Sequence, residues 1–463
     1  MTSKRATLGV RHRDADLESG DTSPQSKWRP YPKYKASGVE WLGEIPATWR
    51  CVRLRYVTRL NPTKNEIHAL DSQLPVSFVP MEAVGEYGGL KLEDARPLGT
   101  LTEGYTYFKD GDVVIAKITP CFENGKGAIA QKLINGIAFG TTELHVLRPR
   151  QCIDAHFLFY LTLSDQFRSL GTAEMLGAAG QKRVPEDFIL DFPVPFPNLQ
   201  DQRFIAAFLN RETAKIDVLI ENKERLIELL QEKRTALITQ AVTKGLDPNV
   251  PMKDSGVEWI DNIPINWSVC PLFTVARERE EINFGNLVQN VLSLSYGKII
   301  DRDVTDNFGL LPESFETYQI VHEGNIILRL TDLQNDKRSL RVGLVNHPGI
   351  ITSAYICLEL FRDIEPSYGH YLLHAYDITK VFYSFGGGVR QTMKFEDLKW
   401  LPILKPSRDE QRTIASFLDR ETAKTDALVA NIHVAINLLQ EYRTALISAA
   451  VTGKIDVRGE VAQ

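Results

Sequence analysis

Two short segments of the sequence place amide and basic side chains directly after a run of glycines. These side chains are Gln181, Lys182 and Arg183 in the first segment, and Arg390, Gln391 and Lys394 in the second. Glycine allows a backbone to approach a phosphate group closely. Lys and Arg neutralise phosphates, and Arg, Lys, Asn and Gln can hydrogen bond to base edges in the major groove. The pattern predicts nucleic-acid contacts, although for each residue alone a solvated surface charge is the simpler interpretation.

Further basic residues lie near strand-like runs in both halves of the chain. They are Lys117, Lys126 and Lys132 in the first half, and Arg329, Lys337, Arg338 and Arg341 in the second. We expect these residues to contact DNA as well. The net charge of −5 argues against a nucleic-acid binder, but local patches, and not the total charge, attract phosphate.

No segment carries the residues of a recognisable catalytic centre. Asn61-Pro62-Thr63 is the nearest match to the Asn-Pro-Pro-aromatic loop of methyltransferases, but it lacks the second proline and the aromatic residue. Gly453-Lys454 is followed by Ile455 and has no glycine five residues before Gly453, so it is not a phosphate-binding loop. The 9 histidines do not cluster and the 5 cysteines form no CxxC pair, so we expect reduced thiols and no metal. We therefore expect a chain without catalysis or a cofactor of its own.

The longest regular pattern occurs twice, at residues 201–243 and 410–452. In each copy aliphatic residues recur at helical spacing, which is the stripe of a helix packed against another helix. They are Leu209, Ile216, Leu219, Leu226, Leu230 and Leu237 in the first copy, and Leu418, Leu428, Ile432, Leu439 and Leu446 in the second. The length favours a coiled coil formed within one chain. Asn210 and Asp419 could instead act as N-caps that break each copy into a short helix and a long one.

The segments before each globular stretch also repeat. Gly-Val-Glu-Trp, then Ile-Pro and a second tryptophan, occurs at residues 37–49 and again at 255–267. We call these the GVEW segments and expect compact loops that pack against a long helix or a partner. A purely structural role is the alternative. Strand-like runs, a helical stretch and the glycine-rich turn follow in both halves, with weaker likeness.

The pattern divides the chain into six parts. They are a polar tail (1–27), a first globular domain (28–198), a first long helix (199–245), a second globular domain (246–405), a second long helix (406–454) and a C-terminal tail (455–463). We expect an α+β fold in which two mixed α/β domains are separated by two long antiparallel helices. The linker at 245–256 contains two prolines and is too short and stiff to return along a helix. Halves related by a pseudo-twofold axis would suit a DNA duplex with two half-sites.

Composition sets broad limits on the class of protein. Hydrophobic residues make up 43% and charged residues 24%, as in ordinary globular proteins. No apolar run approaches membrane length and the N-terminus lacks an apolar signal core, which predicts a cytoplasmic protein with no membrane partner. Residues 1–27 are polar and aperiodic, typical of a disordered tail, with a DNA-contacting arm as the alternative.

The layout resembles the specificity subunit of type I restriction-modification enzymes. The resemblance rests on two differing globules, two similar helices that begin with DQ or EQ and end with TALI-x-x-AVT, and a GVEW segment before each globule. It implies that each globule is a target recognition domain for one half of a bipartite DNA sequence, and that the helices set the half-site spacing.

The same resemblance implies partners. Two methylation subunits would dock on the helices and GVEW segments, and two restriction subunits would complete the nuclease. S-adenosylmethionine, ATP and Mg would then be bound by the partners. The docking residues expected on this chain are Trp41, Trp49, Trp259, Trp267, Gln202 and Gln411. A scaffold whose globules bind proteins, and an enzyme with an unrecognised site, are the two other hypotheses.

Overall fold

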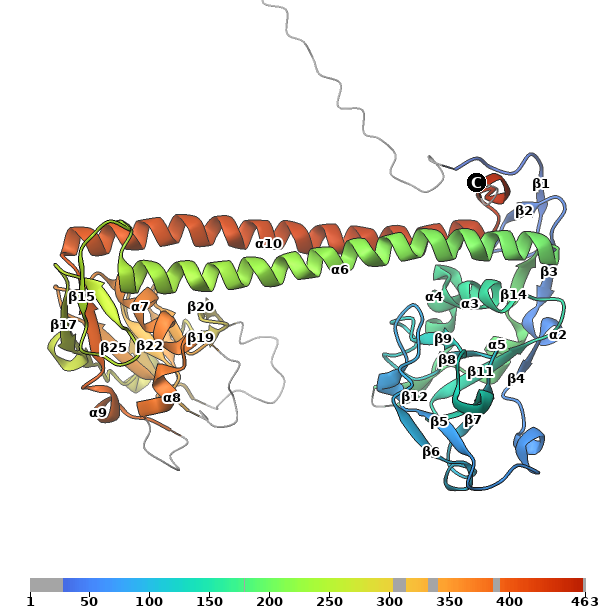
Figure 1. The fold of residues 1–463 in the computed structure, drawn as a ribbon, viewed down its shortest axis with the longest axis horizontal. Helices are drawn as coiled ribbons and strands as arrows, with labels where there is room; N and C mark the ends of the chain where they lie inside the picture. Colours follow the sequence, from blue (N-terminus) through green and yellow to red (C-terminus); the bar gives the residue numbers. More distant parts are fainter. Residues whose placement is uncertain (1–27, 179, 303–313, 332–339, 386–391, 461–463) are drawn as a thin grey trace, which may run out of the picture. The chain divides into compact units, whose positions relative to one another are not determined.

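The computed structural model describes residues 28–178, 180–302, 314–331, 340–385 and 392–460 (Figure 1). The chain divides into two compact units. Unit 1 comprises Met1–Asn222 and Val434–Gln463, and unit 2 comprises Lys223–His433. Each unit therefore contains one globular part and a portion of each long helix. Among the described residues, no helix is both long and apolar enough to cross a bilayer.

Each of the two long periodic segments forms one uninterrupted helix. These are α6 (Leu199–Lys244) and α10 (Arg408–Val451). The predicted alternative, a break at Asn210 or Asp419, is wrong. Both side chains instead accept a hydrogen bond from a tyrosine of their own unit, Tyr160 or Tyr371, over 2.8 Å. A polar residue inside a helix is thus explained by a tertiary contact and not by a helix end.

Only part of the predicted aliphatic stripe is buried. Leu209, Ile216, Leu418, Ile432 and Leu446 are at most 5% exposed. The prediction is wrong for three other leucines, which are between 43% and 49% exposed: Leu219, Leu226 and Leu428. A straight α-helix turns by about 20° per seven residues relative to a strict heptad, so a fixed spacing of seven leaves the buried face.

Unit 1 is built on two four-stranded sheets. One has the order β6-β5-β10-β7, with β10 parallel to β5, and the other has the antiparallel order β4-β11-β8-β9. The strand bounds are β4 Thr58–Leu60, β5 Pro75–Val79, β6 Asp94–Pro97, β7 Thr106–Lys109, β8 Val113–Ala116, β9 Gly127–Ile129, β10 Ile137–Gly140 and β11 Leu144–Pro149. The strand-like runs of the first globule are therefore confirmed.

Helices and two-stranded pairs complete the globular part of unit 1. The helices are α2 Leu54–Val57, α3 Ala155–Leu163, α4 Asp165–Ala173 and α5 Glu186–Asp191. The paired strands are β1 Tyr34–Ala36 with β2 Glu44–Pro46, β3 Arg50–Arg53 with β14 Pro193–Phe196, and β12 Leu176–Ala178 with β13 Gln181–Arg183. Asp154 caps α3 by accepting from the backbone N–H groups of His156 and Phe157, at 2.9 and 3.1 Å.

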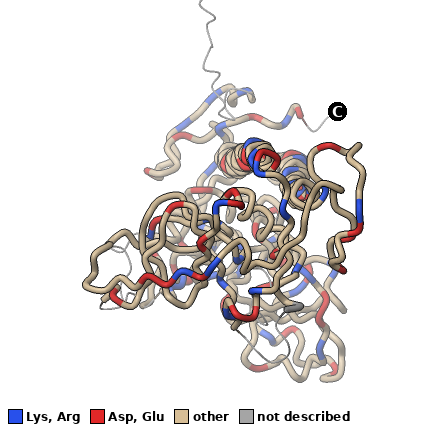
Figure 2. The backbone as a smooth tube through the Cα atoms, turned by 90° about the vertical axis from the view of Figure 1, so that its left-hand side faces the viewer, with Lys and Arg blue, Asp and Glu red and all other residues tan. Residues whose placement is uncertain are grey.

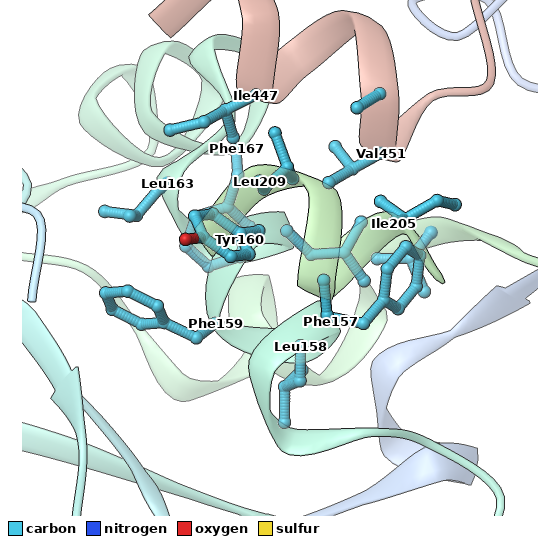
Figure 3. Packing of buried hydrophobic residues seen from close by; sticks show 14 of the residues in the cluster. Phe157, Leu158, Phe159, Tyr160, Leu163, Phe167, Ile205, Leu209, Ile447 and Val451 are labelled. Carbon is cyan, nitrogen blue, oxygen red and sulfur yellow. The ribbon is translucent and has the colours of Figure 1, made fainter. Parts of the chain in front are cut away.

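The main core of unit 1 joins α3 and α4 to both long helices. Phe157 and Phe167 meet Leu209 near the start of α6 and Ile447 near the end of α10 (Figure 3). All four side chains are fully buried. Burying a side chain of this size contributes about 1.5–3 kcal/mol, so this cluster fixes the globule to the helices of its own unit.

The first GVEW segment covers the end of α10. Trp49 is 1% exposed, and a side chain at Gly453, which has φ +74°, would come within 2.9 Å of its ring. Tyr34 donates to the Gly453 carbonyl over 3.0 Å. Beyond the helix, Ile455 and Val457 are fully buried. The first residues of the predicted C-terminal tail are therefore part of the core, whereas Gly459 and Glu460 are exposed.

Unit 2 contains one four-stranded antiparallel sheet with the order β18-β25-β22-β23. Its strands are β18 Ala276–Glu278, β22 Ile326–Leu328, β23 Val342–Leu344 and β25 Ile356–Leu360. Antiparallel pairs join β15 Met252–Asp254 to β16 Asn262–Pro264, β17 Ser268–Pro271 to β26 Pro402–Lys405, β19 Leu292–Ser295 to β20 Lys298–Asp301, and β21 Gln319–Val321 to β24 Gly349–Ile351. The helices are α7 Pro366–Ile378, α8 Val381–Phe385 and α9 Phe395–Leu398.

The second GVEW segment covers the end of α6 in the same way. Lys244 donates to the carbonyls of Ile260 and Asn262, at 3.3 and 2.6 Å. Trp267 is 1% exposed, and its indole N–H donates to Glu410 over 2.9 Å. In each unit, a GVEW segment therefore packs where one long helix ends and the other begins.

Candidate nucleic-acid interface

The hairpin β12–β13 of unit 1 carries the predicted Gln181, Lys182 and Arg183. Its strands pair Leu176 with Arg183, and every described residue of both strands is exposed. Gly177 has φ +144°, and a Cβ there would come within 2.4 Å of the backbone oxygen of Gln181. Only glycine fits this close approach of the two strands. The hairpin therefore presents its polar side chains and its backbone to solvent.

The hairpin is attached to the segment that follows β8. Thr119 and Lys182 form reciprocal hydrogen bonds: the Thr119 N–H donates to the Lys182 carbonyl, and the Lys182 N–H donates to Thr119 Oγ1, both over 3.0 Å. The Val184 N–H donates to the Lys117 carbonyl over 2.9 Å. Lys117 is half-buried beside this junction. The structure thus brings Lys117 together with Lys182 and Arg183.

Arg183 is held by a carboxylate from the turn before β11. Its Nε and Nη2 atoms lie 2.8 Å from Oε2 and Oε1 of Glu143, a two-bond ion pair. The hydrogen bond with Arg183 is the main reason why the pKa of Glu143 lies below its usual value. The Glu143 carbonyl also accepts from the Lys117 N–H over 2.9 Å. Sequence reasoning missed Glu143, because a lone acidic residue in a turn gives no signal.

His145 is a buried polar residue beside the end of the hairpin. His145 is 2% exposed and its Nε2 lies 2.8 Å from the Val184 carbonyl. Burial lowers its pKa, which favours the neutral imidazole as a hydrogen-bond donor to that carbonyl. Asn61 accepts from the Val146 N–H over 2.9 Å and donates to Glu186 over 2.6 Å. Asn61 and His145 therefore serve packing and hydrogen bonding.

A shallow pocket of about 260 Å³ adjoins Lys117 on the same unit. It is lined by Asn61, Pro62, Lys64, Tyr105, Thr106, Tyr107, Lys117, Thr142 and Leu144. Hydroxyl, amide and ammonium groups dominate this lining. Together with the hairpin it forms a polar surface with basic side chains, as a nucleic-acid contact requires.

Lys126 and Lys132 do not join this surface through any contact among the described residues. Lys126 is half-buried and donates to the Met81 carbonyl over 3.2 Å. Lys132 is exposed on the turn after β9, with φ +61°.

Charges of both signs are interspersed along the chain in Figure 2. The net charge therefore gives no guide to where DNA would bind.

The described residues of unit 2 repeat part of this attachment, with a different residue at the bridge. Thr392 bridges to Thr331 as Arg183 bridges to Ile118, and the Met393 N–H donates to the Leu330 carbonyl over 3.0 Å. Lys394 is exposed, and its N–H donates to Asp397 at the start of α9 over 2.9 Å. Four predicted residues lie outside the described residues: Lys337, Arg338, Arg390 and Gln391.

Arg341 requires a correction. Its side chain is fully buried, and its Nη1 donates to the carbonyls of Arg329 and Thr331, at 3.0 and 2.8 Å. A buried guanidinium with these partners cannot reach a phosphate. Through these hydrogen bonds Arg341 links the segment that follows β22 to the segment that precedes β23. Arg329 is half-buried beside it.

Four of the six predicted docking residues point inward. Trp49, Trp267, Gln202 and Gln411 are at most 1% exposed. The Gln411 amide donates to the carbonyls of Asp363 and Pro406, at 3.1 and 3.0 Å, and its oxygen accepts from the Glu365 N–H over 2.8 Å. Gln202 makes the equivalent three bonds in unit 1. These side chains hold each globule to its helix and do not face a partner.

The other two predicted docking residues are more open. Trp41 is half-buried and stacks on Phe192, with ring centroids 5.1 Å apart. Trp259 is 42% exposed. Both tryptophans keep part of their ring at the surface of their unit.

A repeated exposed groove on the long helices was missed by the sequence reasoning. In unit 2 it lies along α6, with a volume of about 540 Å³, and in unit 1 along α10 and α4, with about 670 Å³. Both grooves are lined by Gln, Glu, Thr and Ala at matching places, namely Gln231, Glu232, Thr235 and Ala236, and Gln440, Glu441, Thr444 and Ala445. One sequence signal could have revealed the groove: the two long helices have identical residues there, at positions outside the aliphatic stripe. Packing between the helices does not require that identity.

Residues 89–230 match the family model described as Type I restriction modification DNA specificity domain. The chain is 31% identical to the EcoEI specificity subunit of Escherichia coli over 64% of this chain and 48% of that relative. It is 32% identical to the EcoAI specificity subunit of Escherichia coli over 65% of this chain and 49% of that relative. The chain is therefore similar to type I restriction-modification specificity subunits over about two thirds of its own length.

The aligned region spans about half the length of these curated relatives. A solved structure also resembles this chain, from work described as the structural basis of complex assembly and conformational transition of the type I R-M system. It has a TM-score of 0.62 and 18% identity, over 89% of this chain and 99% of that chain. This likeness concerns the fold alone.

Proposed function

We propose that this chain is the DNA-recognition subunit of a type I restriction-modification system and has no catalysis of its own. Each globular part would read one half of a bipartite target in double-stranded DNA. The observation that carries the proposal is the hairpin attachment. One backbone hydrogen bond and one bridge of this attachment are repeated among the described residues of unit 2, whereas the bridging side chain differs, as expected for two readers with different half-sites.

The proposed DNA contacts centre on the first hairpin. They comprise Lys117, Gln181, Lys182 and Arg183 in unit 1, with Lys126 and Lys132 as peripheral phosphate contacts. In unit 2 we propose Arg329 and Lys394, together with Lys337, Arg338, Arg390 and Gln391. Backbone contacts would supply affinity, and the side chains on the hairpins would supply specificity.

We further propose that α6 and α10 form an antiparallel coiled coil that sets the distance between half-sites, with a pseudo-twofold relation between the halves. Two contacts support this. Within unit 1, Arg443 of α10 pairs with Asp217 of α6. Within unit 2, Arg234 of α6 lies 3.6 Å from Asp426 of α10. The same Asp–Arg pair thus occurs in each unit with the roles of the helices exchanged, as a twofold relation requires.

Two methylation subunits are the proposed partners at the repeated groove. Identical exposed residues on both helices suit two copies of one partner, each bound in the same way. Trp41 and Trp259 remain the proposed contacts from the GVEW segments. Two restriction subunits would join the full complex, with S-adenosylmethionine, ATP and Mg bound by the partners. We place this complex in the cytoplasm, where its DNA substrate lies.

Reconstitution tests the proposal. The purified chain alone should neither methylate nor cleave DNA, and addition of the methylation subunit should give site-specific transfer from S-adenosylmethionine. Base-resolved methylation of the host genome, with and without this gene, would give the bipartite target. Methylation by the isolated chain would contradict the proposal. A DNA-binding curve of the complex with its partners that does not change with salt concentration would instead favour a protein scaffold.

A further inference from the structure

Among the described residues, the Arg183–Glu143 ion pair of the hairpin surface has no counterpart in unit 2. At the bridging position of Arg183, unit 2 has Thr392. At the position directly before the matching strand, unit 2 has Tyr355 in place of Glu143. The pair is therefore not part of the shared hairpin attachment. A feature that one globule has and the other lacks belongs to what that globule alone recognises.

The geometry of the pair leaves one edge of the guanidinium available. Glu143 engages Nε and one side of Nη2, both over 2.8 Å. A guanidinium carries five N–H donors in a planar fork, so the edge formed by Nη1 and the second Nη2 hydrogen is not taken by this carboxylate. Two parallel donors at that edge match the O6 and N7 acceptors of guanine in the major groove.

The surroundings keep the guanidinium in place and in reach of a ligand. The Arg183 side chain is 43% exposed and that of Glu143 is 24% exposed. The Glu143 N–H donates to Thr141 over 3.3 Å, and its carbonyl accepts from Lys117. The backbone of Arg183 is fixed by the hairpin register and by its bridge to Ile118. An orientation fixed before binding lowers the entropy lost on binding and selects one geometry.

We propose that Arg183, oriented by Glu143, reads a guanine in the half-site of the first globule. Glu143 is then a positioning residue and Arg183 the specificity-determining one. The inference rests on the proposed function and deepens it. The competing outcome is that Arg183 contacts a phosphate. A phosphate contact does not require the guanidinium to be held in one orientation, whereas a two-bond contact with guanine does.

The test measures methylation by the complex of this chain with its methylation subunit, on duplex libraries in which each base of both half-sites is varied. With Arg183→Ala and Arg183→Lys, we expect discrimination at a single guanine position of the first half-site to fall by roughly tenfold or more. Discrimination in the second half-site should stay unchanged. Glu143→Gln keeps the shape but weakens the two-bond pair, so it should relax the same position to a smaller extent.

Glu123→Gln provides the matched control, since Glu123 is exposed in the same unit and makes none of these contacts. Unfolding midpoints of all variants should stay close to that of the unmodified protein at neutral pH, because a partly exposed ion pair contributes little to stability. Two results would overturn the inference: unchanged discrimination at every position, or a uniform loss on all sequences with the salt slope reduced by about one, which marks a phosphate contact. If the unmodified complex shows no site-specific methylation, the proposed function itself fails.

Discussion

Substitution of Gln411 by alanine is expected to destabilise unit 2 without removing a partner contact. The side chain is fully buried and makes three hydrogen bonds with backbone groups of Glu365, Asp363 and Pro406. Truncation leaves one buried N–H and two carbonyls without this partner, at about 1–3 kcal/mol for each group. Carbonyls retain a second lone pair, so we expect a loss of about 4 kcal/mol in the free energy of unfolding.

Urea denaturation followed by tryptophan fluorescence measures this loss. With a denaturant slope of about 2–3 kcal/mol per molar, the midpoint of the affected unit should fall by about 1.5 M. Gln202→Ala should give the same result in unit 1, whereas Gln440→Ala on the exposed face of α10 should leave the midpoint unchanged. A stable Gln411→Ala protein that has lost its methylation subunit would refute this reasoning and restore the docking role.

Other predictions follow from single contacts. Tyr371→Phe removes the bonds to Asp419 and Thr422, at 2.8 and 3.2 Å, and should lower the free energy of unfolding of unit 2 by about 1 kcal/mol. Arg341→Met should lower it by about 3 kcal/mol in the same urea assay, because two buried carbonyls lose their donor. Glu441→Lys in the groove of unit 1 should weaken binding of the methylation subunit, measured by titration calorimetry, with an unchanged unfolding midpoint. The pKa of Glu143 is lowered in the folded protein, so the stability contributed by its pair with Arg183 is complete above the ordinary glutamate pKa and is lost as the pH falls below it. Arg183→Ala should abolish that part of the pH dependence.

Sequence patterns predicted the long helices and the strands of the first globule, although they placed three leucines wrongly. The helices at 201–243 and 410–452 show helical spacing, and the strands β5, β8, β10 and β11 are short apolar runs bounded by turn residues. The break at Asn210 failed for a physical reason. A cap-forming residue inside a helix looks the same in the sequence whether it ends the helix or accepts a tyrosine hydroxyl from a distant segment.

The candidate site was predicted only where residues are neighbours in the chain. Gln181, Lys182 and Arg183 follow a glycine turn, and the turn itself supplied the signal. Glu143 lies 2.8 Å from Arg183 but comes from a different strand pair, so no local pattern connects them. Arg341 was misassigned because composition cannot separate a guanidinium in solvent from one that donates to two buried carbonyls.

Comparison of the two halves of the chain distinguishes residues needed for packing from residues available for recognition. Buried residues that match, such as Gln202 and Gln411, are explained by the same three backbone bonds in each unit. Exposed residues that match, such as Gln231 and Gln440, have no such explanation, and they support the proposed contact with a partner. Exposed residues that differ at matching positions, such as Arg183 and Thr392, are where we propose that the two units contact different bases. Exchange of the second globule, residues 268–405, for that of a related chain should accordingly change one half-site, leave the other intact and leave binding of the methylation subunits unaffected.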